Sequence, residues 1–325
     1  MITKPTFLYN KILIVFTMNG DKISFKNDNI IIKDSENQIK FQYTCYKIFI
    51  IYIVGGYTIT TGLIERSRKF GFSLVFLTTN FKITTTINYK TEGNFLLREK
   101  QYTCNIRNKI ANRIVYNKIL NQIKCLEKVN DDSIKEGIVL LENNISKLKD
   151  FDLSISELMG IEGACAKVYF NRIFKDLEWN GRQPRLKKDI PNLLLDVGYT
   201  ILFNYIEALL NIYGFDIYKA NLHQEFYKRK SLVCDIIEPF RTIIDYKIRK
   251  MYNLGQIKLD NFILINNKYN INFNVSKNIT MEFLEEINLY KNCIFDYILK
   301  YYRWFMKDGD IQNMPIARVE KNDTN

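Results

Sequence analysis

Short β-branched and aromatic runs, separated by turn residues, dominate the first 95 residues of the chain. This pattern predicts strands over residues 11–16, 29–32, 48–54, 73–77 and 83–87. The run at 48–54 is apolar throughout, which is typical of a central strand buried on both faces. Between the third and fourth runs, residues 60–70 are predicted to form a short helix that ends at Gly71.

After residue 93 the apolar positions recur at helical spacing, with basic residues such as Lys118 among them. Ser154 and Glu157 have the spacing of a capping box and predict the start of a helix that contains Glu162. Further helices are expected, including one over 190–213, with a hairpin at 262–273. We therefore predict an α+β fold with a β-rich domain (1–93), a larger α-helical domain (94–308) and a flexible tail (309–325).

The composition favours a polyanionic partner. The chain has 325 residues, 47% of them hydrophobic, and a formal net charge of +12, so it can bury a large core and attract nucleic acid. A solvated basic surface would give the same count. The longest apolar run spans seven residues and the start shows no signal-peptide pattern, which predicts a cytoplasmic protein without a membrane segment.

The residue inventory narrows the possible metal chemistry. Six cysteines occur without a CxxC pair, and the chain has one histidine. A zinc ribbon and a zinc enzyme with three histidine ligands are therefore excluded.

The single histidine, His223, lies 12 residues before Asp235 and 15 before Glu238. A helix starting at Leu232 places its apolar residues on one face and these two acids together on the opposite side. Pro239 predicts a kink beside Glu238. Two simpler interpretations remain open: the acids face solvent, and the histidine makes ordinary hydrogen bonds.

Glu162 stands in a run of small residues, from Gly160 to Ala166. Close packing of a second helix against this run is one interpretation. The other is a carboxylate that meets a metal ion at a contact between helices. Oxygen ligands with one imidazole suit Mg²⁺ or Mn²⁺, which can polarise a phosphoryl oxygen while a water or a DNA 3′-hydroxyl attacks.

Two basic segments are candidates for phosphate contacts. Residues 180–188 form a Gly/Pro-containing loop with several cations, and 228–230 reads Lys-Arg-Lys. A flexible solvated connector is the simpler interpretation of the loop.

Ordered blocks of sequence resemble the CRISPR-associated Cas-one integrase family. Residues 162–170 (EGACAKVYF) are similar to its E-G-x-x-A-x-x-Y-F segment. Residues 181–199 resemble its next block, and Leu222-His223 followed by Arg229, Asp235, Glu238 and Arg241 resembles its third. The N-terminal half matches at 57–60 and 71–77, so the resemblance spans roughly residues 10–300.

The resemblance implies a metal-dependent DNA integrase and endonuclease of CRISPR adaptation. Glu162, His223 and Glu238 would be the ligands of Mg²⁺ or Mn²⁺, with Asp235 as a supporting catalytic acid. The implied partners are double-stranded prespacer and repeat DNA, a second copy of the chain bound through the N-terminal domain, and a Cas-two dimer. The candidate DNA contacts are Arg182, Arg185, Lys187, Arg229, Lys230 and Arg241.

Two alternatives stay open. A stand-alone metal nuclease for branched or single-stranded DNA would use the same residues with water as the nucleophile. A non-catalytic DNA-binding scaffold would rely on charge alone and would have no use for the Glu162, His223 and Glu238 set.

Overall fold

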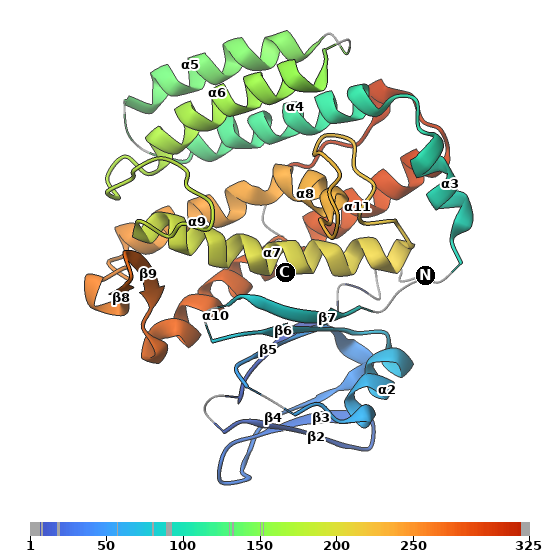
Figure 1. Cartoon of the computed structure of the whole chain (residues 1–325), viewed down its shortest axis with the longest axis vertical. Coiled ribbons are helices and arrows are strands. Elements are labelled where there is room, and N and C mark those ends of the chain that lie inside the picture. The colour runs from blue at the N-terminus through green and yellow to red at the C-terminus, as the bar shows by residue number, and fades with distance from the viewer. Residues whose placement is uncertain are drawn as a thin grey trace. The chain divides into compact units, whose positions relative to one another are not determined.

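The computed structural model describes residues 7, 9–17, 20–56, 58–79, 81–88, 93–129, 131, 133–149, 151 and 153–319. The chain divides into two compact units. The first comprises residues 1–93 with Glu207–Gly214, and the second comprises Asn94–Ile206 with Phe215–Asn325. The predicted α+β class is confirmed, because strands fill the first unit and helices the second (Figure 1). Tyr57, part of one block of the family resemblance, lies outside the described residues.

The first unit is built around a four-stranded sheet. Its order is β1 (Lys11–Phe16), β5 (Ile48–Val54), β6 (Ser73–Leu77), β7 (Ile83–Ile87). The first three strands are parallel and β7 is antiparallel to β6. All seven residues of β5 are buried, as predicted for a strand with neighbours on both sides and apolar cover on both faces.

The crossover between β5 and β6 is the helix α2 (Thr61–Phe70), which ends at Gly71 with φ 73°. That left-handed conformation suits glycine and closes the helix, so the predicted helix and its end are both confirmed.

A second sheet was only partly predicted. Antiparallel strands β2 (Lys22–Lys26), β3 (Asn29–Lys33) and β4 (Ile39–Thr44) pair in that order. Only β3 was expected, because β2 and β4 are half-exposed and carry polar residues that interrupt the apolar pattern. Ile30 and Ile32 of β3 pack in the same core as Ile51 and Ile53 of β5.

The second unit is mainly helical, and its elements follow the sequence pattern closely. The helix at 190–213 is shared, because its residues from Glu207 onward belong to the first unit. Helices α4, α5 and α6 pack together in a layer (Figure 1). The helix predicted at 190–213 and the hairpin at 262–273 are both present. The elements are α3 (Phe95–Thr103), α4 (Arg107–Leu126), α5 (Ser133–Ser146), η3 (Lys147–Lys149), α6 (Ile155–Ile173), α7 (Ile190–Tyr213), α8 (Ser231–Ile237), η4 (Glu238–Phe240), α9 (Arg241–Asn253), η5 (Leu259–Asn261), β8 (Phe262–Ile265), β9 (Lys268–Ile271), α10 (Phe273–Leu289), α11 (Lys291–Met306) and η6 (Ile311–Asn313).

Among the described helices, α7 alone has the length and apolar composition that could cross a membrane. Of its most apolar stretch, 83% is buried inside the protein. This burial is typical of a core helix, so α7 provides no positive sign of a membrane segment.

The tail predicted to be flexible from residue 309 is ordered over its first part. Met314 and Ala317 are buried, and η6 lies between residues 311 and 313. The Asn117 amide donates to the Ala317 carbonyl at 2.8 Å and accepts from its N–H at 2.7 Å. The prediction of a flexible segment starting at 309 is therefore wrong for these residues, because the Asn117 side chain of α4 hydrogen-bonds to the Ala317 backbone. Residues 320–325 lie outside the described part of the chain.

Candidate active site

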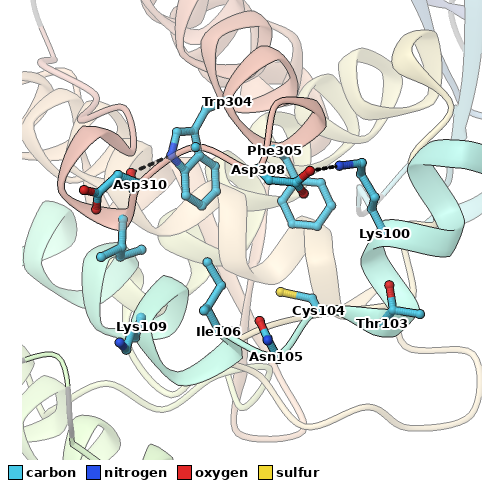
Figure 2. Close-up of a pocket in the computed structure, with 12 residues that line it drawn as sticks. Lys100, Thr103, Cys104, Asn105, Ile106, Lys109, Trp304, Phe305, Asp308 and Asp310 are labelled. Atoms are coloured by element: carbon cyan, nitrogen blue, oxygen red, sulfur yellow. Dashed lines mark hydrogen bonds and ion pairs between the residues drawn. The ribbon is translucent and has the colours of Figure 1, made fainter.

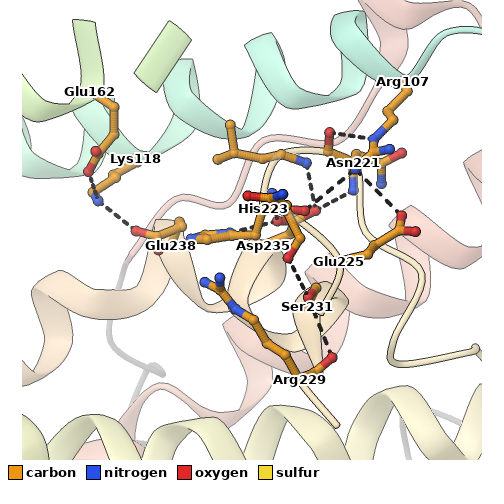
Figure 3. Close-up of polar contacts among 12 residues, drawn as sticks. Arg107, Lys118, Glu162, Asn221, His223, Glu225, Arg229, Ser231, Asp235 and Glu238 are labelled. Carbon is orange, nitrogen blue, oxygen red and sulfur yellow. Dashed lines mark hydrogen bonds and ion pairs between the residues drawn. The ribbon is translucent and has the colours of Figure 1, made fainter. Parts of the chain in front are cut away.

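Two carboxylates converge on one ammonium group in the helical unit. Glu162 comes from α6, Glu238 from η4 and Lys118 from α4 (Figure 3). The Lys118 Nζ contacts Glu162 Oε1 and lies 2.6 Å from Glu238 Oε2. Lys118 was expected only as one of several basic residues among helical apolar positions, so its place between the two acids is new information from the structure.

The start of α6 is fixed two turns before Glu162. Ser154 and Glu157 make both contacts of the predicted capping box: Glu157 N–H donates to Ser154 Oγ at 3.3 Å, and Ser154 N–H donates to Glu157 Oε2 at 2.8 Å. Such a box satisfies two backbone donors at the helix end. The register of Glu162 along α6 therefore follows from local sequence.

The small residues around Glu162 do not receive a second helix at their exposed positions. Gly160, Gly163 and Ala164 are exposed. Among the described residues, no heavy atom lies within 4 Å of a Cβ built at Gly160 or Gly163. The packing interpretation of this stretch is wrong at these positions, and the flank of α6 beside Glu162 is open.

Pro239 shapes the turn that carries Glu238. Helix α8 ends at Ile237, a 3-10 turn follows, and α9 begins at Arg241, as the predicted kink requires, because proline cannot continue the backbone ladder. The Asn121 amide of α4 donates to the Pro239 carbonyl at 2.9 Å. This turn directs Glu238 inward, where it is buried.

Asp235 is buried too and organises the chain before α8. Its Oδ2 accepts the backbone N–H groups of Asn221 at 2.6 Å and Leu222 at 3.0 Å. Its Oδ1 accepts the backbone N–H of His223 at 2.9 Å and lies 2.8 Å from His223 Nδ1. The interpretation that Asp235 and Glu238 face solvent is therefore wrong: both carboxylates are enclosed by donors.

The Asp235 contact fixes the orientation of the His223 ring. A carboxylate accepts hydrogen bonds, so the Nδ1 proton points to Asp235 and Nε2 is the ring nitrogen that faces Glu238. Nε2 lies 3.7 Å from Glu238 Oε1. The imidazole is thus oriented toward the cluster, and the sequence prediction that His223 folds back to the two acids is confirmed.

Charge around Glu238 overcomes its burial. Burial raises the pKa of this carboxyl, yet Arg241, Lys118 and His223 lower it to about 2. Conversely, burial lowers the pKa of the Lys118 ammonium, while Glu238 and Glu162 raise it above its ordinary value. Lys118 and Glu238 are therefore both charged at neutral pH.

Arg241 is held against the same carboxylate. Its Nε lies 3.0 Å from Glu238 Oε2, and its guanidinium stands over the Tyr199 ring at 4.6 Å. Glu238 Oε2 is therefore paired with two cations, Lys118 and Arg241.

Beneath Arg241, Asp245 forms a second buried acid centre that sequence reasoning missed. Tyr199 Oη donates to Asp245 Oδ1 at 2.5 Å and Tyr169 Oη donates to Oδ2 at 3.0 Å. Burial raises the pKa of the Asp245 carboxyl to about 6, although the tyrosine hydroxyls lower it. Tyr169 and Tyr199 each lie in one of the two blocks that resemble the family. The presence of a tyrosine in both blocks was the sequence feature that could have indicated this centre.

The side chains of Glu162, Glu238 and His223 are of the kinds that bind a divalent metal ion, although Lys118 contacts both acids. Within the described residues, no three His, Cys, Asp or Glu side chains are grouped closely enough to hold an ion as they stand. The donor set of two carboxylates and one imidazole, with Nδ1 held by a carboxylate, is nevertheless suited to Mg²⁺ or Mn²⁺.

The predicted DNA contacts occupy different environments. Arg182 donates to Asn192 Oδ1 and Asp196 Oδ1, both at 2.9 Å. The Arg185 side chain is exposed, while its backbone N–H donates to Asp196. The remaining positions are half-buried: Lys187, Arg229, Lys230 and Arg241. Arg241 differs most from the expectation, because its guanidinium is paired with Glu238.

A separate cavity of about 440 Å³ lies near the start of α4 (Figure 2). Its aromatic wall is Trp304 and Phe305, and the Trp304 Nε1 donates to the Asp310 carbonyl at 2.8 Å. Lys100 at its rim is ion-paired with Asp308. The lining includes none of the predicted site residues, so this cavity is distinct from the acidic cluster.

Fold and site together define a class: a basic α+β protein with buried carboxylates and an imidazole at one point, as in enzymes that process nucleic acids. The sequence model of the family described as CRISPR associated protein Cas1 (Cas-one) matches residues 14–285. The chain belongs to this family.

Two curated relatives show the extent of the similarity. A CRISPR-associated endonuclease Cas1 of Thermodesulfovibrio yellowstonii is 32% identical over 221 residues, covering 63% of this chain and 70% of the relative. A CRISPR-associated protein Cas1 of Methanobrevibacter ruminantium is 28% identical over 272 residues, covering 77% and 81%. The match therefore includes most of each relative.

Solved structures share the fold. A casposase bound to an integration product has a TM-score of 0.76 at 21% identity, covering 97% of this chain and 96% of that one. A CAS1 protein from Thermotoga maritima has a TM-score of 0.73 at 20% identity, covering 91% and 97%. A Cas6-RT-Cas1–Cas2 complex has a TM-score of 0.79 at 19% identity, covering 97% of this chain and 36% of that one.

Proposed function

We propose that this protein is a metal-dependent DNA integrase and endonuclease of CRISPR adaptation, which joins prespacer 3′-hydroxyl ends to the repeat by transesterification. The observation that carries the proposal is a chain of contacts: the Lys118 ammonium joins Glu162 to Glu238, and His223 Nε2 lies 3.7 Å from the other carboxylate oxygen of Glu238. Three segments distant in sequence supply these groups, and the chain is a member of the Cas1 family.

Glu162, His223 and Glu238 are the residues that would hold Mg²⁺ or Mn²⁺. When bound, such an ion polarises a phosphoryl oxygen and stabilises the attacking and leaving oxygens. Asp235 holds the His223 ring so that Nε2 faces Glu238. The open flank of α6 beside Glu162 leaves room for a phosphodiester to approach.

The joining reaction needs no nucleophilic side chain. The 3′-oxygen of the prespacer forms a bond to a repeat phosphorus as the bond to the leaving 3′-oxygen breaks. The attacking hydroxyl loses a proton and the leaving oxygen gains one, so atoms and charge balance. With water as the nucleophile the same site hydrolyses DNA, a second activity favoured by the names of curated relatives, which are called endonucleases.

The proposed partners follow from charge and from the neighbours. A net charge of +12 favours duplex prespacer and repeat DNA, with contacts from Arg182, Arg185, Lys187, Arg229 and Lys230. Two structural neighbours are complexes whose titles name Cas2, which supports a small Cas2 dimer as partner. A homodimer through residues 1–93 and a cytoplasmic location complete the proposal.

A strand-transfer assay tests the function. Purified protein is mixed with a duplex carrying 3′-hydroxyl ends, a supercoiled plasmid bearing a repeat, and Mn²⁺ or Mg²⁺. Joined products are expected for the wild type and for E285Q, a control at an exposed glutamate of α10. E162Q and H223A should lose joining while keeping duplex affinity, because they remove candidate ligands and leave the basic surface intact.

Joining that persists in H223A, or that survives a chelator, would contradict the proposed metal site. Hydrolysis without joining would favour the stand-alone nuclease. Affinity for DNA with neither reaction would favour the scaffold.

A further inference from the structure

Lys118 is a buried lysine whose environment consists of the candidate metal ligands. Its side chain is 10% exposed, and its ammonium contacts Glu162 and lies 2.6 Å from Glu238 Oε2 (Figure 3). An ammonium at this point neutralises two carboxylates that would otherwise repel one another in a low-dielectric setting. A divalent ion bound by Glu162 and Glu238 would neutralise the same two carboxylates.

The ammonium and a divalent ion cannot share this position. Both need the same carboxylate oxygens, and two cations at such separation repel strongly when buried. Glu238 keeps a second counter-charge in any case, because Arg241 Nε lies 3.0 Å from its Oε2 and the guanidinium rests on the Tyr199 ring. If the Lys118 ammonium moved away, Glu238 would thus remain paired with Arg241 and keep its orientation.

The backbone beside Lys118 is fixed, so displacement involves the side chain alone. On either side of it along α4, the Asn117 and Asn121 amides donate to the Ala317 carbonyl at 2.8 and 3.0 Å. Asn121 also donates to the Pro239 carbonyl at 2.9 Å. A lysine has a flexible four-carbon stem, which allows its ammonium to leave while α4 stays in place.

We propose that Lys118 is a positioning residue that holds Glu162 and Glu238 together in the metal-free protein and competes with the divalent ion for them. The affinity of the site for Mg²⁺ or Mn²⁺ is then set by the free energy of displacing this ammonium. The inference rests on the proposed function, since it assumes that these carboxylates are metal ligands.

Metal binding to K118Q tests the competition. Glutamine keeps an N–H donor near the acids and removes the charge. Mn²⁺ titrations followed by calorimetry and by electron paramagnetic resonance of the free ion should give a Kd about tenfold lower than the wild type. K118R retains a competing cation and should stay near the wild-type Kd.

Lys247 supplies the matched control. Its side chain is 9% exposed and its ammonium pairs with Glu282 at 2.5 Å and Glu286 at 3.8 Å. K247Q removes an equally buried charge from a carboxylate pair away from His223, so the Mn²⁺ affinity should not change. A Kd that is unchanged or higher in K118Q, or lowered equally in K247Q, overturns the proposal.

A measurement on the wild type covers the case in which K118Q does not fold. Amine-selective labelling followed by peptide mass spectrometry should show more modification of Lys118 when Mn²⁺ is added, with Lys247 unaffected. Unchanged or reduced labelling of Lys118 overturns the inference.

Failure of the proposed function gives a different result. In that case either the wild type does not bind Mn²⁺, or E162Q binds it as tightly as the wild type. If E162Q does weaken binding while both Lys118 tests are negative, the metal site stands and the lysine competition is wrong.

Discussion

Glu238 and Asp245 are buried acids seven residues apart, and their surroundings shift their pKa values in opposite directions. Glu238 is enclosed by the cations of Lys118 and Arg241, and its pKa falls to about 2. Asp245 is enclosed by the hydroxyls of Tyr169 and Tyr199, and burial raises its pKa to about 6. Burial penalises the charged form of both groups, so the nature of the partners decides the outcome.

The contrast separates two roles within one pair of helices. Glu238 stays ionised and is able to bind a cation. Asp245 is close to neutral under mildly acidic conditions and supports Tyr199, on whose ring Arg241 rests. Asp245 thus holds Tyr199 in place, and the Tyr199 ring supports Arg241, one of the cations that keep Glu238 ionised.

The largest effect is expected from breaking the cation-paired centre with E238Q. Lys118 and Arg241 would then lie buried beside a neutral amide, and removing one partner of a buried ion pair costs about 3–5 kcal/mol. Strand transfer should fall by about a thousandfold or more, because a candidate ligand is lost. Chemical denaturation and the joining assay measure the two effects.

E238Q should also lose less of its free energy of unfolding than the wild type as the pH falls. Ionised Glu238 stabilises the fold above its ordinary pKa of 4.5, and this contribution is lost as the pH falls toward about 2. Full activity in E238Q would remove Glu238 from the site.

D245N should remove a pH dependence of the free energy of unfolding that has the opposite sign to the one from Glu238. Because the folded-state pKa is near 6 and the ordinary value is 3.8, the folded protein binds the proton more tightly. The free energy of unfolding of the wild type should therefore decrease, by about 3 kcal/mol in all, as the pH rises from below 3.8 to well above 6. Asparagine cannot titrate, so this component should vanish from urea denaturation measured across the window. An unaltered pH profile would contradict the raised pKa.

A smaller loss of stability is expected when the helix packing beneath Asp245 is overfilled. A Cβ added at Gly198 of α7 would lie 2.4 Å from Ile244 Cγ2 and 3.3 Å from Phe283 Cδ1. G198A should cost about 1–3 kcal/mol, measured by thermal or chemical denaturation. G160A, at an exposed helical glycine with open space around it, is the control and should be neutral or stabilising. Equal stability of the two variants would show that α7 and α9 separate easily.

The smallest effect concerns the exposed cations. R185Q should reduce the slope of log affinity against log salt by about 0.9 if Arg185 contacts one duplex phosphate. R241Q should leave that slope nearly unchanged and reduce joining instead, because its guanidinium is paired with Glu238. Filter binding over a range of salt concentrations distinguishes the two. A slope that responds to R241Q but not to R185Q would reverse the assignment.

Much of this arrangement could be predicted from local sequence rules. The buried strand β5, the helix 190–213, the capping box of α6 and the kink at Pro239 depend on neighbours in the chain. The return of His223 to the acids was also predictable, since a short connection separates them. For such features, spacing and residue type are sufficient.

Contacts between distant helices could not be predicted in the same way. Lys118 and Glu238 are 120 residues apart, and nothing in a helical pattern specifies that α4 meets η4. The Asp245 centre depends on α6, α7 and α9 meeting at one point. The packing interpretation of the small residues near Glu162 failed for a related reason: a small side chain permits a close neighbour but does not require one.

The anchoring of residues 221–223 by Asp235 has a consequence for how this protein can diversify. The following residues, 224–228, are exposed, with Tyr227 at 90%, and the chain is held again where Ser231 Oγ donates to the Gln224 carbonyl at 3.0 Å. Glu225 in this excursion lies 3.5 Å from Arg107, whose guanidinium also donates to the His223 carbonyl at 3.5 Å. A substitution at Glu225 therefore reaches the histidine through Arg107, whereas one at Tyr227 changes the exposed surface and leaves the contacts of Asp235 with residues 221–223 in place.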